Sequence, residues 1–283
     1  MTASLLFLIG AAVGSFLNVV ALRYSPDHFL FFGSLHGRSH CPHCKKTLRW
    51  FELAPIVSFV LQGGRCLRCR ARIGIRYPAV ELLSGLIFVF VPLRLSIVFP
   101  LLPTTYYLLP TVVWVVVFEL LLLISLIDLR HSLIPDEANI ALGALGIAYV
   151  VFLAATAGVV SFTGDIAPLL SVSQNPWVAH GLGALFGLLF FGAIIAITRG
   201  RGMGLGDLKL AIPLGFLFGW PDIMMVTMFG FVVGAAYGIW AMAARGKHMK
   251  SAVPFGPFLA LGAALVFFFG YELADAYFSF FLA

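Results

Sequence analysis

Residues 110–127 read PTVVWVVVFELLLLISLI and contain a single ionisable residue, Glu119. A helix rises about 1.5 Å per residue, so a run of about 20 predominantly apolar residues can cross a bilayer. The composition extends this pattern to the whole chain, because 61% of the 283 residues are apolar and only 11% are charged. Soluble domains have roughly 45–50% apolar and about 25% charged residues. We therefore expect an integral membrane protein, with no room for a large soluble enzyme domain.

The remaining apolar stretches predict an all-α polytopic membrane protein with about eight transmembrane helices, one of them short. No Lys or Arg precedes the first stretch, so we expect a retained span rather than a secretory leader. The expected spans are 4–22, 79–98, 110–127, 138–157, 178–198, 208–220, 223–244 and 253–281. These spans divide the chain into a first transmembrane helix (1–22), a cytoplasmic loop (23–77) and a membrane domain (78–283).

The basic residues indicate the topology. Residues 23–77 hold 10 of the 18 Lys and Arg residues. If this loop is cytoplasmic, helix alternation puts 17 of the 18 on the same side, with Arg94 as the exception, as the positive-inside rule predicts. We read the net charge of +6 as a topology signal. The expected partner is the lipid bilayer, and no nucleic acid is expected.

The long polar loop contains all four cysteines, as two CxxC pairs separated by 21 residues. Such a spacing is typical of a structural zinc site, in which four thiolates surround Zn²⁺ and leave no open position for catalysis. Two disulfides are the alternative, although disulfides are uncommon in the cytoplasm. His40 and His43 lie beside the first pair and are read as bystanders. The expected ligands are Cys41, Cys44, Cys66 and Cys69.

Asp128 and Asp207 are the candidate catalytic residues. Asp128 follows an apolar run, so it lies at a helix C-terminus, where a negative charge opposes the helix dipole. Asp207 ends Gly-Leu-Gly-Asp before a short apolar segment, and its structural alternative is a helix N-cap. The topology puts both at the cytoplasmic boundary. Two carboxylates in one poorly solvated site share a proton, which is the chemistry of aspartyl proteases.

Other polar residues in or near the spans have structural interpretations. Glu119 lies nine residues before Asp128, about 13 Å deeper on a straight helix and on its opposite face. For Glu81 and Asn18 we expect interhelical hydrogen bonds. Asp136 and Glu137 fit the acidic first turn of a helix, and we also consider them for steering a basic substrate.

A different class of protein must be weighed against a protease. An ion-coupled transporter also uses intramembrane carboxylates, as a proton relay, and a metal-binding loop could then act as its gate. That reading predicts a midplane site and inverted repeats. No repeat is visible in the sequence, and both aspartates fall at one face of the membrane.

The ordered set of motifs resembles the type IV prepilin peptidases over nearly the whole chain. The matching stretches are GSFLNVV (14–20), the two CxxC pairs, RYPAVELL (76–83), Ile127-Asp128 through IPD (134–136), GLGDLKL (204–210) and PFGPF (254–258). Another type of GxGD intramembrane protease is disfavoured by the cysteine loop and the last motif. A methyltransferase without protease activity is disfavoured by the two aspartates. The stretch between Ala157 and Trp177 matches nothing in the family pattern.

The resemblance implies an aspartyl endopeptidase of the bacterial inner membrane. Its substrates would be type IV prepilins and type II secretion pseudopilins, whose basic leader it would remove at the cytoplasmic face. It implies that Asp128 and Asp207 are the catalytic pair. Members with the cysteine loop are commonly bifunctional and methylate the new N-terminal residue with S-adenosylmethionine as donor. The sequence assigns no residue to the donor and does not determine the oligomeric state.

Overall fold

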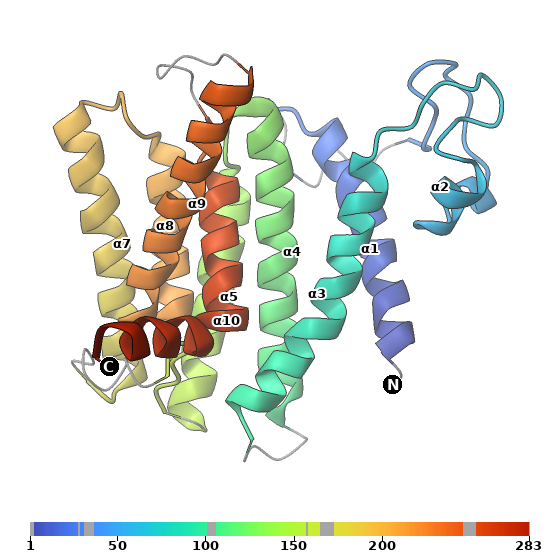
Figure 1. Cartoon of the computed structure of the whole chain (residues 1–283). Coiled ribbons are helices and arrows are strands. Elements are labelled where there is room, and N and C mark those ends of the chain that lie inside the picture. Colours follow the sequence, from blue (N-terminus) through green and yellow to red (C-terminus); the bar gives the residue numbers. More distant parts are fainter. Residues whose placement is uncertain are drawn as a thin grey trace. The chain divides into compact units, whose positions relative to one another are not determined.

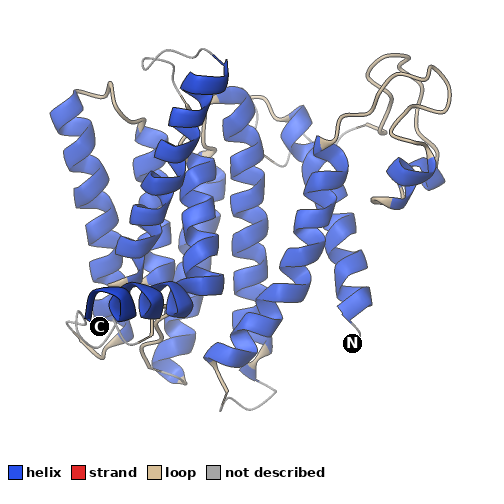
Figure 2. Cartoon of the chain, viewed as in Figure 1, coloured by secondary structure: helices blue, strands red, loops and turns tan. Residues whose placement is uncertain are grey.

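The computed structural model describes residues 3–27, 29–30, 37–100, 106–156, 158–164, 173–245 and 253–282, and in these residues it contains helices and loops but no strand (Figures 1 and 2). Seven helices in these residues are long and apolar enough to cross a membrane. They are α1 (Ala3–Arg23), α3 (Arg76–Val98), α4 (Leu108–His131), α5 (Asp136–Ala155), α7 (Pro176–Thr198), α9 (Asp222–Arg245) and α10 (Gly256–Leu282).

Each of these seven helices coincides with an expected span to within a few residues. The remaining expected span, 208–220, is the helix α8 (Leu205–Phe218), which has 14 residues. This helix is shorter than the roughly 20 residues that a bilayer requires. The fold class is therefore confirmed: seven helices are full-length spans, and α8 corresponds to the one span that was expected to be short.

The chain forms two compact units, Met1–Leu93 and Arg94–Ala283. In the first unit, α1 and α3 lie in close contact through small residues. A Cβ on Gly10 would lie 2.6 Å from the Ser84 carbonyl oxygen, and one on Gly14 would lie 2.8 Å from that of Val80. Glycines thus allow the backbones to approach, as is common in membrane helix pairs. The Asn18 side chain donates to the Tyr77 carbonyl oxygen at 3.2 Å, so the interhelical bond expected for Asn18 is present.

The first unit also holds the cysteine loop. Two short helices lie between the CxxC pairs: the 3₁₀-helix η1 (Trp50–Leu53) and α2 (Val57–Leu61). Ile56, between them, donates its backbone N–H to Oε2 of Glu81 at 2.7 Å. Glu81 thus holds the loop against α3, and it also forms the expected bond to another helix, because its carboxylate accepts a hydrogen bond from the Ser15 hydroxyl of α1.

In the second unit, α4 supplies much of the core. Trp114 of α4 is fully buried, and the rings of Tyr149, Phe162, Phe218 and Phe267 surround it with centroids at 5.4, 5.2, 5.0 and 4.7 Å. These contacts join α4 to α5, α8 and α10. The short helix α8 also lies against α7 with almost no space between the backbones, because a Cβ on Gly187 would lie 2.6 Å from the Ala211 carbonyl oxygen.

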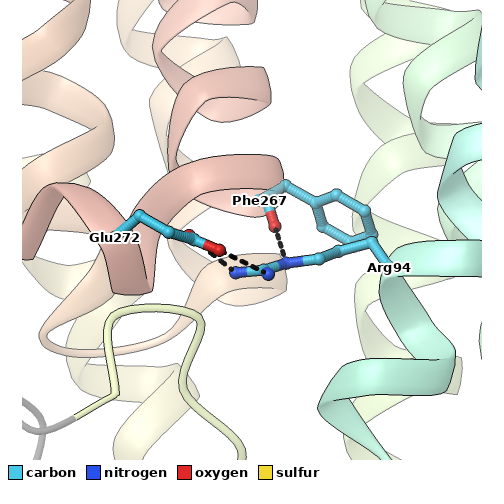
Figure 3. A network of polar contacts seen from close by, with 3 residues as sticks. All are labelled: Arg94, Phe267 and Glu272. Carbon is cyan, nitrogen blue, oxygen red and sulfur yellow. Dashed lines mark hydrogen bonds and ion pairs between the residues drawn. The ribbon is translucent and has the colours of Figure 1, made fainter.

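Arg94, the one basic residue that departs from the charge pattern, has partners within the protein. Its Nε donates to the Phe267 carbonyl oxygen at 3.0 Å, and its Nη1 lies 3.2 Å from Oε1 of Glu272 (Figure 3). The guanidinium is therefore neutralised by α10. The ion pair therefore explains why a basic residue can lie at this end of α3, although the positive-inside rule disfavours one there.

The stretch after α5 is fastened to the start of α9. Both carboxylate oxygens of Asp222 accept hydrogen bonds of 2.6 Å, from the hydroxyls of Ser161 and Thr163 and from the Phe162 backbone N–H. These bonds hold part of the stretch that lacks a family pattern. Residues 157 and 165–172 of the same stretch lie outside the described part of the chain.

Candidate active site

Asp128 lies in the last turn of α4, and its side chain is buried. Its Oδ2 accepts a hydrogen bond of 3.0 Å from the backbone N–H of Gly256, the first residue of α10. The free N–H groups and the dipole at a helix N-terminus favour a negative charge. The dipole of α4 therefore disfavours a negative charge on Asp128, whereas the dipole of α10 favours one.

Asp207 lies in the first turn of α8, at its third residue. Its Oδ2 accepts a hydrogen bond of 3.2 Å from the N–H of Gly204, which is the N-cap. The N-cap interpretation of Asp207 is thus wrong by position, because the cap residue is Gly204. The carboxylate nevertheless bonds the free N–H of that cap residue, as an acidic residue at this position commonly does.

The two aspartates interact. Burial and then the negative charge of Asp128 raise the pKa of Asp207 to about 6, while the Gly204 N–H opposes this shift. Both sites also share Ile134 as a neighbour: a Cβ on Gly206 would lie 3.5 Å from Ile134, and one on Gly256 would lie 3.4 Å from it. The structure therefore brings the end of α4, the start of α8 and the start of α10 together around Ile134.

Asp136 and Lys209 form an ion pair near the two aspartates. Lys209 Nζ lies 2.8 and 2.9 Å from the two carboxylate oxygens of Asp136. Both side chains are more than half exposed, so the pair contributes little to stability. The ion pair offsets the charge of Asp136.

Gly256 lies in the PFGPF motif, but the sequence alone did not predict a role for it. A Cβ on Gly256 would lie 2.7 Å from Oδ2 of Asp128, so only glycine allows this approach. The signal in the sequence was a glycine between two prolines at the start of a helix. Its partner was hidden because Asp128 is 128 residues away.

The four cysteines gather in the loop of the first unit. Their sulfur atoms all lie within 4.8 Å of one another, and the Sγ atoms of Cys41 and Cys69 are 3.8 Å apart. Tetrahedral zinc, with Zn–S distances of about 2.3 Å, requires sulfurs about 3.8 Å apart. All four are free thiols rather than disulfides. Their positions fit a tetrahedral metal ion.

The two halves of this cluster have the same backbone pattern. Lys45 N–H donates to the Cys41 carbonyl at 2.9 Å, and Arg70 N–H donates to the Cys66 carbonyl at 3.0 Å. Backbone N–H groups of Cys69 and Arg68 lower the pKa of Cys66 to about 7, whereas the Ala71 N–H is outweighed by burial and the other three cysteines, which raise the pKa of Cys69 to about 11. A lowered thiol pKa favours the thiolate, which is the metal-binding form.

These features define a helical membrane protein with paired carboxylates at helix ends and a four-cysteine loop, and comparisons with known proteins agree. Residues 8–95 match the Bacterial Peptidase A24 N-terminal domain, and residues 115–239 match the Type IV leader peptidase family. The chain belongs to the type IV leader peptidase family. The resemblance seen in the sequence is therefore confirmed.

Several curated relatives cover nearly the whole chain. The chain is 33% identical over 274 residues to the prepilin leader peptidase/N-methyltransferase of Bacillus subtilis, with 97% of each protein covered. It is 31% identical to the protein of the same name from Aeromonas salmonicida, covering 98% of this chain and 94% of the relative. For that of Pseudomonas aeruginosa the identity is 30%, covering 96% and 92%. Among solved structures there is no significant match. The transporter reading has no support in these comparisons.

Proposed function

We propose that the chain is a membrane aspartyl endopeptidase that cleaves the basic leader from type IV prepilins and type II secretion pseudopilins. The observation that carries the proposal is the convergence of Asp128 and Asp207 around Ile134, with the charge of one raising the pKa of the other. The names of the relatives support prepilins as the substrate class.

The environments of the two aspartates suggest separate roles. Asp128 accepts the Gly256 N–H at the start of α10, and this bond partly offsets the cost of burying its negative charge. Asp207 holds its proton to a higher pH than an ordinary aspartate. In this mechanism Asp128 removes a proton from the attacking water, while the Asp207 carboxyl donates a hydrogen bond to the scissile carbonyl oxygen. One carboxylate and one carboxylic acid are the pairing that aspartyl proteases use.

The active site would face the cytoplasm of the bacterial inner membrane. The support is the distribution of basic residues: if α8 crosses together with the seven long helices, alternation puts 17 of the 18 on the side of the cysteine loop. A prepilin presents a basic leader before an apolar helix, so cleavage at the cytoplasmic boundary needs aspartates at helix ends rather than at the midplane. Asp128 in the last turn of α4 and Asp207 in the first turn of α8 meet that need. The proposal also divides the chain into a first transmembrane helix (1–22), a cytoplasmic loop (23–77) and a peptidase membrane domain (78–283).

The cleavage test uses the purified full chain in detergent with a synthetic prepilin-like peptide. We expect Asp128→Asn and Asp207→Asn each to abolish cleavage, and Asp136→Asn, an exposed neighbour, to retain it. Thermal unfolding of each variant shows that it is folded. Cleavage that survives either of the first two substitutions in a folded protein would remove that aspartate from the mechanism.

The second proposed activity is N-methylation of the newly exposed terminus, with S-adenosylmethionine as methyl donor. It is supported by the names of the relatives and by the complete cysteine loop. No residue can be assigned to the donor. Methyl transfer to a precleaved peptide should survive in Asp128→Asn, because that reaction needs no peptide-bond hydrolysis. Its loss together with cleavage would place both activities on one pair of carboxylates.

The proposed metal of the loop is structural zinc, held by Cys41, Cys44, Cys66 and Cys69. It would fold residues between the two CxxC pairs and leave no position for substrate. We expect metal analysis of the purified protein to find one zinc ion per chain, and a Cys41→Ser variant to lose it. Iron in place of zinc, or disulfides found by thiol counting, would refute this assignment.

A further inference from the structure

The two short helices between the CxxC pairs expose large apolar side chains. Trp50 of η1 is 84% exposed, and Val60 and Leu61 of α2 are 67% and 82% exposed. Apolar side chains gathered on a twelve-residue segment (Trp50–Leu61) commonly mark a surface that another partner covers. We call residues 50–61 the loop tip.

A hydrogen bond joins the loop tip to a defined position along α3. Ile56, in its middle, bonds the side chain of Glu81 at 2.7 Å. Glu81 is the sixth residue of α3, so it lies about 7.5 Å along the helix from its start. Because α3 is a membrane-spanning helix, this bond places the middle of the loop tip beside the first turns of that span. Interfacial helices bury their apolar face to a similar depth, about 5–10 Å.

The charges around the loop tip fit an anionic lipid surface. Residues 37–75 carry eight basic residues and one acidic residue, Glu52. The Glu52 carboxylate accepts a bond of 2.8 Å from the Arg49 N–H. Clusters of Lys and Arg beside a membrane helix attract anionic lipid headgroups. The same positive charge disfavours a basic leader peptide or a second copy of this loop as the partner.

We propose that the loop tip is a membrane-interface anchor for the cysteine loop. The side chains of Trp50, Val60 and Leu61 enter the boundary between headgroups and acyl chains, and nearby Lys and Arg residues bind the phosphates of anionic phospholipids. Tryptophan is well suited to this boundary, because its ring is apolar and its N–H is polar. The anchor would hold the cysteine loop against the bilayer independently of the peptidase reaction.

The test measures whether Trp50 contacts lipid. The full chain and the conservative variant Trp50→Phe are reconstituted into vesicles of phosphatidylcholine and phosphatidylglycerol, with or without bromine on the upper acyl chain. The difference in emission between the two proteins isolates Trp50 from the other four tryptophans. At interfacial depth, brominated lipid should quench this signal. A Trp50 signal that resists brominated lipid but is quenched by iodide in the water would overturn the proposal.

Two further measurements distinguish anionic lipid from a second copy of the chain and from neutral lipid. Contact with a second copy predicts a signal that brominated lipid does not quench and that shifts as the protein is diluted with lipid, which would also overturn the proposal. In vesicles of phosphatidylcholine alone, quenching should fall. Equal quenching in both lipids would overturn the role of the anionic headgroups.

A double variant tests whether η1 and α2 act together. Val60→Ser with Leu61→Ser should lower the quenching of Trp50, whereas Leu67→Ser should leave it unchanged. Leu67 lies in the second CxxC pair and is 47% exposed, so it is a matched apolar site outside the loop tip. Metal content shows that each loop is folded. Wild-type quenching in a folded double variant would refute the anchor.

Discussion

The backbone N–H of Gly256 and Oδ2 of Asp128 are joined by a hydrogen bond of 3.0 Å. The bond connects the end of α4 to the start of α10, and it directs one oxygen of Asp128 toward a helix N-terminus. The same bond leaves no space for a side chain at position 256. A glycine with no chemistry of its own therefore determines where a candidate catalytic carboxylate lies.

Gly256→Ala should lower kcat much more than it raises KM. The added Cβ would lie 2.7 Å from Oδ2 of Asp128, so the carboxylate must move. A misplacement of about 1 Å can reduce a rate about a hundredfold. Steady-state kinetics on a prepilin-like peptide would measure both constants.

The matched control for this prediction is Gly143→Ala, because a Cβ at position 143 would have no neighbour within 4 Å. This helix-interior substitution should leave activity unchanged and stabilise the protein by up to about 1 kcal/mol. Full activity in a folded Gly256→Ala variant would contradict a positioning role for Gly256.

The pH dependence of cleavage follows from Asp207. Burial and the charge of Asp128 raise its pKa to about 6. If Asp207 must be protonated, kcat/KM should fall as the pH rises above this value, approaching a tenfold decrease per pH unit, because kcat/KM reports the free enzyme. A profile measured in one detergent, with unfolding followed at each pH, would test this. A flat profile up to pH 8 would exclude a protonated Asp207 from the rate-determining step.

Asp207→Asn should stabilise the protein near pH 7 while it abolishes cleavage. The pKa of Asp207 is higher in the folded state than its ordinary value, so the ionised group destabilises the folded state above about pH 6. A shift from 3.8 to about 6 corresponds to at most about 3 kcal/mol. Below about pH 4 the carboxyl is protonated in both states and the difference vanishes. Thermal unfolding at the two pH values would measure it. An equal gain in stability at both pH values would show that the effect of Asp207→Asn comes from packing rather than from the charge.

The left-handed backbone at Lys45 predicts a stabilising substitution in the cysteine loop. Lys45 and Arg70, each directly after a CxxC pair, have φ of 57° and 58°. Glycine adopts this conformation without steric cost, so Lys45→Gly should strengthen the metal-bound loop by about 1 kcal/mol. Release of the proposed metal ion to a chelator should then be several times slower.

Lys46→Gly is the control for this experiment, because residue 46 has no positive φ. This substitution adds the flexibility of glycine without relieving strain, so it should not release the proposed metal ion more slowly than the wild type. Faster release from Lys45→Gly than from Lys46→Gly would show that strain at residue 45 is not the determining factor.

Arg94 should matter more for stability than its ion-pair partner. Arg94→Met removes the bond to the Phe267 carbonyl as well as the ion pair, and we expect a loss of about 2–3 kcal/mol. The Glu272 side chain is 57% exposed, so Glu272→Gln should cost less than about 1 kcal/mol. Thermal unfolding of both variants would test the order. Equal losses would show that the ion pair, rather than the carbonyl bond, accounts for the stability contributed by Arg94.

The positions of the helices could be predicted closely from the sequence. The expected span 178–198 became Pro176–Thr198, and 223–244 became Asp222–Arg245. Such agreement is possible because lipid requires a continuous apolar run of nearly constant length for each span. The short helix α8 is the exception, because its 14 residues lie against α7, α5 and other protein rather than spanning lipid alone.

The candidate site was predictable only in its residue types. Asp128 and Asp207 were recognisable as carboxylates at helix ends, but their shared neighbour Ile134 and the bond from Gly256 were not. The sequence identified Arg94 as an exception to the charge pattern, but it did not predict that Phe267 and Glu272 of α10 are its partners. In each case the partner is far away in the chain, and no local pattern encodes such a contact.

The sequence by itself determined the membrane-spanning helices, the four thiols and the two aspartates, because apolar run length, ligand spacing and charge at a helix end are local properties. The tertiary structure alone decided how these residues meet. It brought the dipole of α10 to Asp128, the charge of Asp128 to Asp207 and the sulfur of Cys41 to within 3.8 Å of that of Cys69. These relationships depend on distances between separate helices and turns, which are set by the packing of the whole fold.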